Sequence, residues 1–467
     1  MKNNIIRLVM SFVIITTLCA CDDYLDNIPK GEKVPTTFAD FNAMLNYESG
    51  CHSQDAGQTI ILMNDRFVSS SLLNYYGYWK ANYMWDETAD RIDLNNSYEM
   101  TYYYGYGIIS TVNLVIENVE DATDGTAEEK KILMAQAKTL RADAYFFLLN
   151  YYSKTYNPTT SATDGGIPII TSAEVNAPYT QMSVKECYEF ILNDINDALP
   201  NLPEKSQNIL YPTIGTGYAL AARVYLQMQN YEKALEYAEK ALSINNQLFD
   251  WNEFYEANKS VMDVAGSYQT TASPMGYDFC ENYNFTHGAV YYSTTEYQIR
   301  LDRAAKFEEG DRSLKCRWKY RKVGENEYYQ GILSGYYNRG LTTTEIYLIK
   351  AECLARLGDV DNAIKILNTV RKKRINPSIY QDKTANTAAE AIKLINRTKS
   401  DALLMSYIPF CDRRRLNLES STAETFTKTE GGVNYTLSPT SSLWTFPFPL
   451  GAVKISGNGS VTQNVEK

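Results

Sequence analysis

The fold is decided by the stretch Tyr218-Ala-Leu-Ala-Ala-Arg-Val-Tyr-Leu-Gln-Met-Gln-Asn-Tyr-Glu-Lys-Ala-Leu-Glu-Tyr-Ala-Glu-Lys-Ala-Leu-Ser-Ile-Asn245. Its apolar residues follow helical spacing on both sides of Gln229-Asn230 and stop there, so we expect two helices joined by a turn. Small residues let two antiparallel helices approach closely. Small and aromatic residues recur at Ala222, Tyr225, Ala234, Ala238 and Ala241.

This pattern is typical of a tetratricopeptide helix pair, and it occurs again further along the chain. A second match runs from Glu345 to Val370, with Gly358 where the first helix needs a left-handed cap. A third, weaker match covers residues 135–152, and its partner helix is displaced to Ser183–Leu199 by a loop. Such pairs cannot bury their faces alone, so we expect them to stack.

Three long segments lack clean periodicity, namely residues 53–97, 246–306 and 419–460. Loops of this length in a compact domain are usually functional or disordered. The first two segments are too rich in aromatic residues for disorder. We therefore expect them to carry function.

The N-terminus has the pattern of a lipoprotein export signal. Lys2 and Arg7 precede an apolar run, and Leu18-Cys-Ala-Cys21 ends it with small residues before a cysteine. We expect residues 1–20 to be removed and Cys21 to be acylated, which would tether the chain without spanning the membrane. An ordinary secretory signal or a short membrane anchor is the alternative.

Composition excludes several classes of function. The 467 residues carry a net charge of -10, and no basic cluster is interleaved with aromatics, which argues against nucleic-acid binding. There are only two histidines, which disfavours metal, triad or proton-shuttle chemistry. The cysteines after the signal form no CxxC pair, so zinc sites are not expected. Cys187 and Cys353 fall at core-facing helical positions, and we interpret them as buried free thiols.

Motifs along nearly the whole chain resemble those of the SusD/RagB family of surface lipoproteins. The resemblance rests on the segment after the lipobox, Leu140-Arg-Ala-Asp-Ala-Tyr-Phe-Phe-Leu148, Gly166-Ile-Pro168, Ala222-Arg-Val-Tyr-Leu226, Phe307 with Asp311-Arg312, Ala351-Glu352 and Thr462-Gln-Asn464. It implies an all-α fold of four tetratricopeptide-like helix pairs, here about 128–245 and 340–418, packed against a loop-rich half with little β structure. Residues 21–467 would then form a single unit, with ligand-binding parts at about 53–97 and 246–306.

The resemblance also implies a function and a partner. Such proteins capture glycans, or in some cases peptides, on a TonB-dependent outer-membrane transporter of SusC type. The chain would be surface-exposed and anchored in the outer membrane through Cys21. Two departures are visible: Asn396-Arg397 and Asp412-Arg-Arg-Arg415 match the family's last repeat only loosely, and Val465-Glu-Lys467 replaces its usual C-terminal tail.

Residues 74–87 are the first candidate ligand site, because sugars are held by flat aromatic rings together with hydrogen-bonding groups. The aromatic candidates are Trp79, Tyr83 and Trp85, and the polar candidates are Asn82, Asp86 and Arg66. In the resemblance, Trp85 occupies the place of the family's platform tryptophan. The alternative for Trp79 and Trp85 is that they pack in the core.

Residues 275–297 supply a second set of candidates, Tyr283 and Tyr291, since the resemblance places this segment at the same site. The stripe Tyr98, Tyr102, Tyr106, Ile109, Val112 and Ile116 has helical spacing and is interpreted as a buried face. Trp251 and Trp318 are also assigned to the core.

No catalytic constellation or cofactor motif is found, so we expect no enzyme and no cofactor. Asp86-Glu87 and Glu308-Glu309 are interpreted as solvated loop charges rather than glycosidase pairs. Capture of peptides or other nutrients, a helical-repeat adaptor that binds only protein, and a lipid-anchored hydrolase stay open as alternatives. The sequence names no sugar, linkage or chain length.

Overall fold

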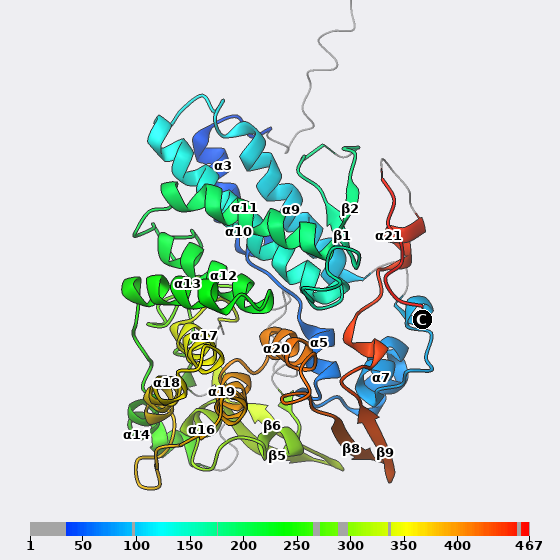
Figure 1. Cartoon of the computed structure of the whole chain (residues 1–467), viewed down its shortest axis with the longest axis vertical. Coiled ribbons are helices and arrows are strands. Elements are labelled where there is room, and N and C mark those ends of the chain that lie inside the picture. Colours follow the sequence, from blue (N-terminus) through cyan, green and yellow to red (C-terminus); the bar gives the residue numbers. More distant parts are fainter. Residues whose placement is uncertain are drawn as a thin grey trace, which may run out of the picture.

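The computed structural model describes residues 34–95, 99–174, 176–264, 271–287, 298–334, 338–454 and 459–466. The predicted signal, Cys21 and Tyr291 lie outside these residues. Helices predominate, and the strands form small sheets of two or three strands (Figure 1). The prediction of a helical fold with little β structure is confirmed.

Four antiparallel helix pairs form one side of the molecule, as expected. They fill the left and centre of Figure 1, with α10 and α11 uppermost and α18 and α19 near the bottom. The pairs are α10 (Ala127–Tyr152) with α11 (Val184–Ala198), α12 (Ile214–Gln227) with α13 (Tyr231–Ile244), α17 (Thr343–Arg356) with α18 (Val360–Lys372), and α19 (Ala388–Ala402) with α20 (Ile408–Leu416).

The turns and small residues lie where the sequence pattern placed them. Gln229 has a φ of 60°, and the Asn230 side chain caps α13 by accepting from the Lys233 amide at 3.1 Å. Gly358 has a φ of 93° and ends α17, a conformation that a side chain would strain. Ala234 is fully buried, together with Ala222, Ala238 and Ala241. The repeat register is therefore confirmed.

Buried ion pairs join successive helix pairs. The Arg223 guanidinium of α12 donates to both carboxylate oxygens of Glu345 in α17, at 2.8 and 2.7 Å. Arg415 of α20 reaches back to Glu352 of α17 in the same way. The loosely matched last repeat is thus a regular α19, a connection over residues 403–407 and a short α20.

The first part of the described chain covers α10. It consists of α3 (Phe38–Leu45), α4 (Glu48–Cys51) and α9 (Met100–Asn118). On α9, Tyr102, Ile109 and Val112 are buried and Tyr106 is partly buried, which confirms the predicted apolar stripe over the described residues. Tyr98 lies outside them.

The other half of the molecule is less regular but contains more helix than expected. The sequence predicts a loop-rich segment over residues 53–97, but the structure contains α5 (Gly57–Leu62), α6 (Ser70–Tyr75), α7 (Gly77–Met84) and α8 (Arg91–Leu94) there. Each has at most eight residues. Two helical turns are too short to show periodicity in sequence, and such helices depend on tertiary packing.

The remaining elements complete this half. The short helices are α14 (Trp251–Met262), α15 (Leu301–Ala304), α16 (Arg312–Arg317), α21 (Leu450–Lys454) and the 3-10 turns η1 (Leu199–Asn201) and η3 (Ser442–Trp444). The paired strands are β1 (Gly165–Ile169) with β2 (Thr180–Ser183), β3 (Thr271–Ala272) with β7 (Leu333–Ser334), and β8 (Phe426–Glu430) with β9 (Val433–Leu437). One sheet has the order β4 (Gln298–Ile299), β6 (Asn326–Gly331), β5 (Trp318–Val323).

Core assignments made for single residues hold. Cys187 and Cys353 are buried free thiols, and burial raises the pKa of the Cys187 thiol to about 12. Trp251 and Trp318 are also buried. Among the described residues, no helix is long and apolar enough to cross a membrane.

Candidate functional site

The predicted ligand segment folds as two short helices, α6 and α7, joined at Tyr76. The Ser69 side chain caps α6, and α7 ends at Trp85, whose φ of 54° is left-handed. In Figure 1 these helices lie at the lower right, near the β8–β9 hairpin. The helical turns direct alternate aromatic side chains inward and outward, which separates the candidates into two groups.

Trp85 is in the inward group. Its side chain is 6 % exposed, its indole Nε1–H donates to the Leu62 carbonyl oxygen at 2.7 Å, and its ring centroid lies 6.5 Å from that of Phe426. The ring therefore offers no open face to a sugar in this arrangement. The structure matches the alternative that Trp85 packs in the core.

Of the two polar candidates on this segment, the Asn82 side chain is buried and the Asp86 side chain is exposed. Asn82 is fully buried, where its amide donates to Gln58 Oε1 at 2.9 Å and its oxygen accepts from Arg91 at 3.3 Å. Asp86 is exposed and accepts from the Thr88 hydroxyl and amide, which lowers the pKa of its carboxyl. Asn82 supports the fold of α7, while Asp86 closes a surface turn.

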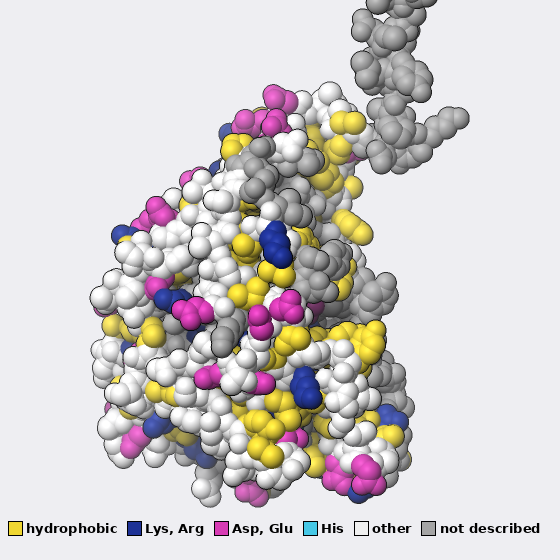
Figure 2. Space-filling model, turned by 90° about the vertical axis from the view of Figure 1, so that its right-hand side faces the viewer, with side chains coloured by type: hydrophobic (Ala, Val, Ile, Leu, Met, Phe, Trp, Pro, Cys, Tyr) yellow, Lys and Arg dark blue, Asp and Glu magenta, His cyan; other side chains and the backbone are white. Residues whose placement is uncertain are grey.

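Three aromatic side chains of α6, α7 and their junction form a cluster, which we call the aromatic face: Tyr75, Tyr76 and Trp79. Trp79 is half-buried and also packs against the core cluster that contains Leu73 and Tyr83. Tyr75 is 78 % and Tyr76 42 % exposed, and the rings of Tyr76 and Trp79 stack with centroids 4.8 Å apart. The Arg66 guanidinium lies 5.1 Å from the Trp79 ring centroid. Figure 2, which looks onto this side of the molecule, shows hydrophobic side chains at the surface.

Tyr83 belongs to a polar cluster beside the aromatic face. Its hydroxyl donates to Glu430 at 3.4 Å and accepts from Arg300, which also donates to Glu430. The Lys428 ammonium lies 4.0 Å from the Tyr83 ring centroid and 4.6 Å from that of Trp85. These contacts fasten the β8–β9 hairpin to α7.

Tyr283, the candidate of the second loop among the described residues, is not brought to this face. Tyr283 is buried, and its hydroxyl donates to the Asn245 main-chain oxygen at 2.6 Å. It therefore packs between the helix pairs and the loop that follows them. Tyr291 lies outside the described residues.

An open cleft of about 950 Å³ adjoins the polar cluster. We call it the acidic cleft, because Asp302, Glu325, Glu327 and Glu430 outnumber its two basic groups, Arg300 and Lys428. Its walls are α6, the end of α7, the start of α15, the turn between β5 and β6, and the β8–β9 hairpin. Amides, hydroxyls and the Phe67 ring add the mixed surface that sugar recognition needs.

Lys428 is the basic group most affected by its surroundings. Its ammonium donates to Asn64 Oδ1 at 2.9 Å and to the Tyr83 carbonyl oxygen, beneath the cleft floor. Burial, and next the neighbouring Arg300 charge, lower the pKa of Lys428 to about 7. The positive charge of the floor therefore varies with pH near neutrality.

Sequence reasoning missed Tyr75, Tyr76, Arg300 and the β8–β9 hairpin. The hairpin has a usable signal, because Gly431-Gly432 separates two runs rich in β-forming residues. Both glycines have positive φ, 56° and 80°, as the tight turn requires. Arg300 had no such signal, since it reaches the site only through the sheet formed by β4, β5 and β6.

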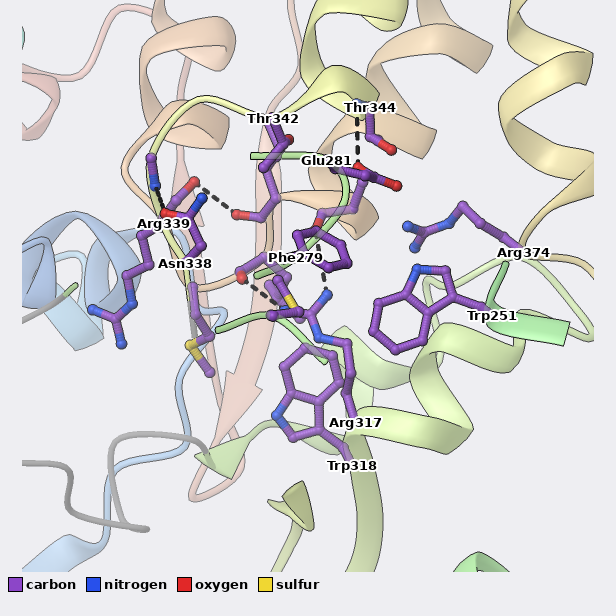
Figure 3. A pocket seen from close by; sticks show the side chains of 17 residues that line it. Trp251, Phe279, Glu281, Arg317, Trp318, Asn338, Arg339, Thr342, Thr344 and Arg374 are labelled. Atoms are coloured by element: carbon purple, nitrogen blue, oxygen red, sulfur yellow. Dashed lines mark hydrogen bonds between the residues drawn. The ribbon is translucent and has the colours of Figure 1, made fainter. Parts of the chain in front are cut away.

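A second hollow, shown in Figure 3, is too small for a sugar. It has a volume of about 40 Å³ and lies between Trp251, Trp318, Phe279 and Arg317. Such a space holds water molecules at most. Within the described part of the chain, no group of side chains has the geometry to hold a metal ion.

Comparison with known families covers both halves of the chain. A family model described as "Starch-binding associating with outer membrane" matches residues 23–226, and the SusD family model matches residues 275–465. A tetratricopeptide repeat model matches residues 216–248. The chain belongs to the SusD/RagB family.

Curated relatives and solved structures agree with this assignment. A SusD-like protein of Bacteroides ovatus is 25% identical over 56% of this chain and 53% of its own length, so the match spans about half of that relative. The SusD-like protein P38 of Formosa agariphila is 22% identical over 74% of this chain and 76% of its own.

The fold is shared with several solved SusD-like structures. A SusD-like protein of Bacteroides fragilis has a TM-score of 0.67 at 17% identity, covering 92% of this chain and 98% of its own. A SusD-like carbohydrate binding protein of Bacteroides vulgatus has a TM-score of 0.60 at 18% identity, covering 93% and 100%.

Proposed function

We propose that this chain is a cell-surface lipoprotein that binds glycans and delivers them to a TonB-dependent outer-membrane transporter of SusC type. The observation that carries the proposal is the aromatic face of Tyr75, Tyr76 and Trp79, carried by the same two helices that wall the acidic cleft. Stacking surfaces and fixed polar groups together suit a sugar, which has an apolar face and a hydroxylated edge. The starch-binding family whose model matches this chain and the carbohydrate binding protein of Bacteroides vulgatus that shares its fold support the same ligand class.

Ligand capture in this proposal involves no chemistry. Three of the four cleft carboxylates are held by cations: Arg300 binds Asp302 at 2.8 Å and also Glu430, and Lys322 binds Glu327 at 2.6 Å. The hydrogen bond with Lys322 lowers the pKa of the Glu327 carboxyl, whereas a general acid at neutral pH requires a raised one. Incubating pure protein with its bound glycan should release no reducing ends.

The binding role is tested with Tyr75→Ala/Tyr76→Ala. Both side chains are exposed, so the fold should be kept, while loss of stacking should remove most affinity, because a site of millimolar to micromolar strength has only about 4 to 8 kcal/mol in total. The measurement is calorimetric titration against a panel of neutral oligosaccharides. Tyr104→Ala is the matched control, since Tyr104 is 43 % exposed on α9, outside this face. Equal affinities of the two variants would exclude the aromatic face.

The alternatives predict other results in the same assay. Binding of a peptide panel, with no glycan bound, would replace sugar by peptide as the ligand. Binding of neither, with a protein partner retained, would favour the helical-repeat adaptor.

The lipid anchor is tested separately. Cys21→Ala should leave the protein in the soluble fraction, and membrane partitioning equal to that of the natural protein would contradict the lipoprotein assignment.

A further inference from the structure

A second cleft lies on the other side of the β8 strand. It has a volume of about 610 Å³ and is walled by α15, α19, α20 and residues 422–426. It shares no lining residue with the acidic cleft, because β8 contributes Phe426 here and residues 427–430 there. This volume lies within the range of small-molecule sites, about 300 to 1,000 Å³.

The mouth of this cleft is basic. Lys306, Lys393 and Arg397 line it and are exposed. Among the described residues, no carboxylate lies within ion-pair distance of these three side chains; Arg397 donates only to the Lys306 main-chain oxygen, at 3.2 and 3.1 Å. They therefore form a positive mouth on a protein whose net charge is -10.

The carboxylates inside the cleft are held by cations other than those at the mouth, although Asp65 and Asp401 share Arg303. Arg303 binds Asp65 at 2.7 Å and Asp401 at 2.9 Å. Asp412 is held by Lys399 at 2.8 Å and by Arg415 at 3.1 Å, and Glu424 by Arg413 at 2.9 Å. The exposed positive charge of the cleft is thus that of the three side chains at the mouth.

The floor of the cleft is apolar and includes an aromatic ring. Ile392 and Leu416 are buried beneath it, and the half-buried Phe426 faces it. The Lys306 ammonium lies 5.2 Å and the Arg413 guanidinium carbon 5.6 Å from the Phe426 ring centroid. A ring of a ligand would meet the apolar floor while its acidic group meets the basic mouth.

We propose that this cleft is a second ligand site, which takes a small organic anion with an apolar face, such as an acidic sugar bearing a carboxylate or sulfate. The basic mouth of this cleft attracts such an anion, whereas the carboxylates of the acidic cleft repel it. The two sites are independent in their residues, so the proposal goes beyond glycan capture at the aromatic face.

The test uses the whole mature protein and trigalacturonate as the probe, with maltotriose as a neutral trisaccharide. Calorimetry should show trigalacturonate binding that weakens as NaCl is raised, because exposed charges are screened. Lys393→Gln/Arg397→Gln should weaken it about tenfold, since two of the three mouth cations are lost. Lys131→Gln/Lys205→Gln makes the same charge change at exposed residues outside the cleft and should bind normally.

Several outcomes distinguish the sites. Tyr75→Ala/Tyr76→Ala should leave trigalacturonate binding unchanged, so failure of the aromatic face does not count against this cleft. Sulfate ion should compete with trigalacturonate if the mouth alone supplies the affinity. Equal binding by Lys393→Gln/Arg397→Gln and its control, or no binding of trigalacturonate by the natural protein, would overturn the proposal. Lys393→Gln alone serves as the second variant if the double substitution lowers the melting temperature.

Discussion

The indole Nε1–H of Trp85 donates a hydrogen bond of 2.7 Å to the main-chain oxygen of Leu62, and this bond fixes the end of α7 on α5. The Lys428 ammonium lies over the same indole ring, 4.6 Å from its centroid. Trp85 thus connects three segments that are far apart in the sequence. Its ring acts in the core, while the aromatic face is left to Tyr75, Tyr76 and Trp79.

Replacing Trp85 should accordingly affect stability first. Trp85→Ala should lower the free energy of unfolding by about 3 to 5 kcal/mol, because a large buried ring and a buried hydrogen bond are lost. Chemical denaturation measures this directly. If the variant kept its stability but lost glycan affinity, this result would contradict the core role and indicate that Trp85 binds the ligand.

Ala234 tests the repeat register. Ala234→Trp should destabilise the protein by about 1 to 3 kcal/mol or more, because Ala234 is fully buried where α13 meets α12 and an indole cannot fit there. Thermal melts measure the effect, with Glu232→Trp on the exposed side of α13 as control. The control should melt close to the natural protein; an equal loss in both variants would argue against the register.

Arg415 tests how the last repeat is held. Arg415→Met should cost about 3 to 5 kcal/mol, because it leaves the buried Glu352 carboxylate with one fewer cation. Arg415→Met/Glu352→Met should recover part of that loss by removing the unpaired charge. The two denaturation curves decide the point, and a double variant less stable than the single one would contradict it.

Lys428 predicts a pH dependence of stability. Its pKa is about 7 in the folded protein and near 10.5 when unfolded, so between these values the unfolded chain binds a proton that the folded chain does not. The stability of the natural protein relative to Lys428→Met should therefore rise as the pH increases from 7 toward 10. Denaturation at several pH values measures the difference. A fall over this range would show that the Tyr83 and Trp85 rings hold Lys428 charged.

The candidate site shows that the residue types in a segment do not predict which of its side chains face the core and which face solvent. The aromatic and polar content of residues 74–87 predicts a ligand site, and α6 and α7 do carry a candidate face. Helical turns of eight residues or fewer then decide that Trp85 and Asn82 point inward while Tyr76 points outward. The orientation of these side chains depends on which side of α7 is covered by α5 and β8, and the local sequence pattern does not predict this packing.

The sequence by itself determined the helix pairs, their turns and their buried small residues, because helical spacing and capping are local properties of the chain. It also determined the family, through motifs spread over most of its length. Only the tertiary structure decided which aromatics face solvent and how charge is divided between the two clefts. Those features join Arg300, Lys428 and Phe426 to α6, α7 and α19 across long sequence separations, so they arise only when the chain is packed.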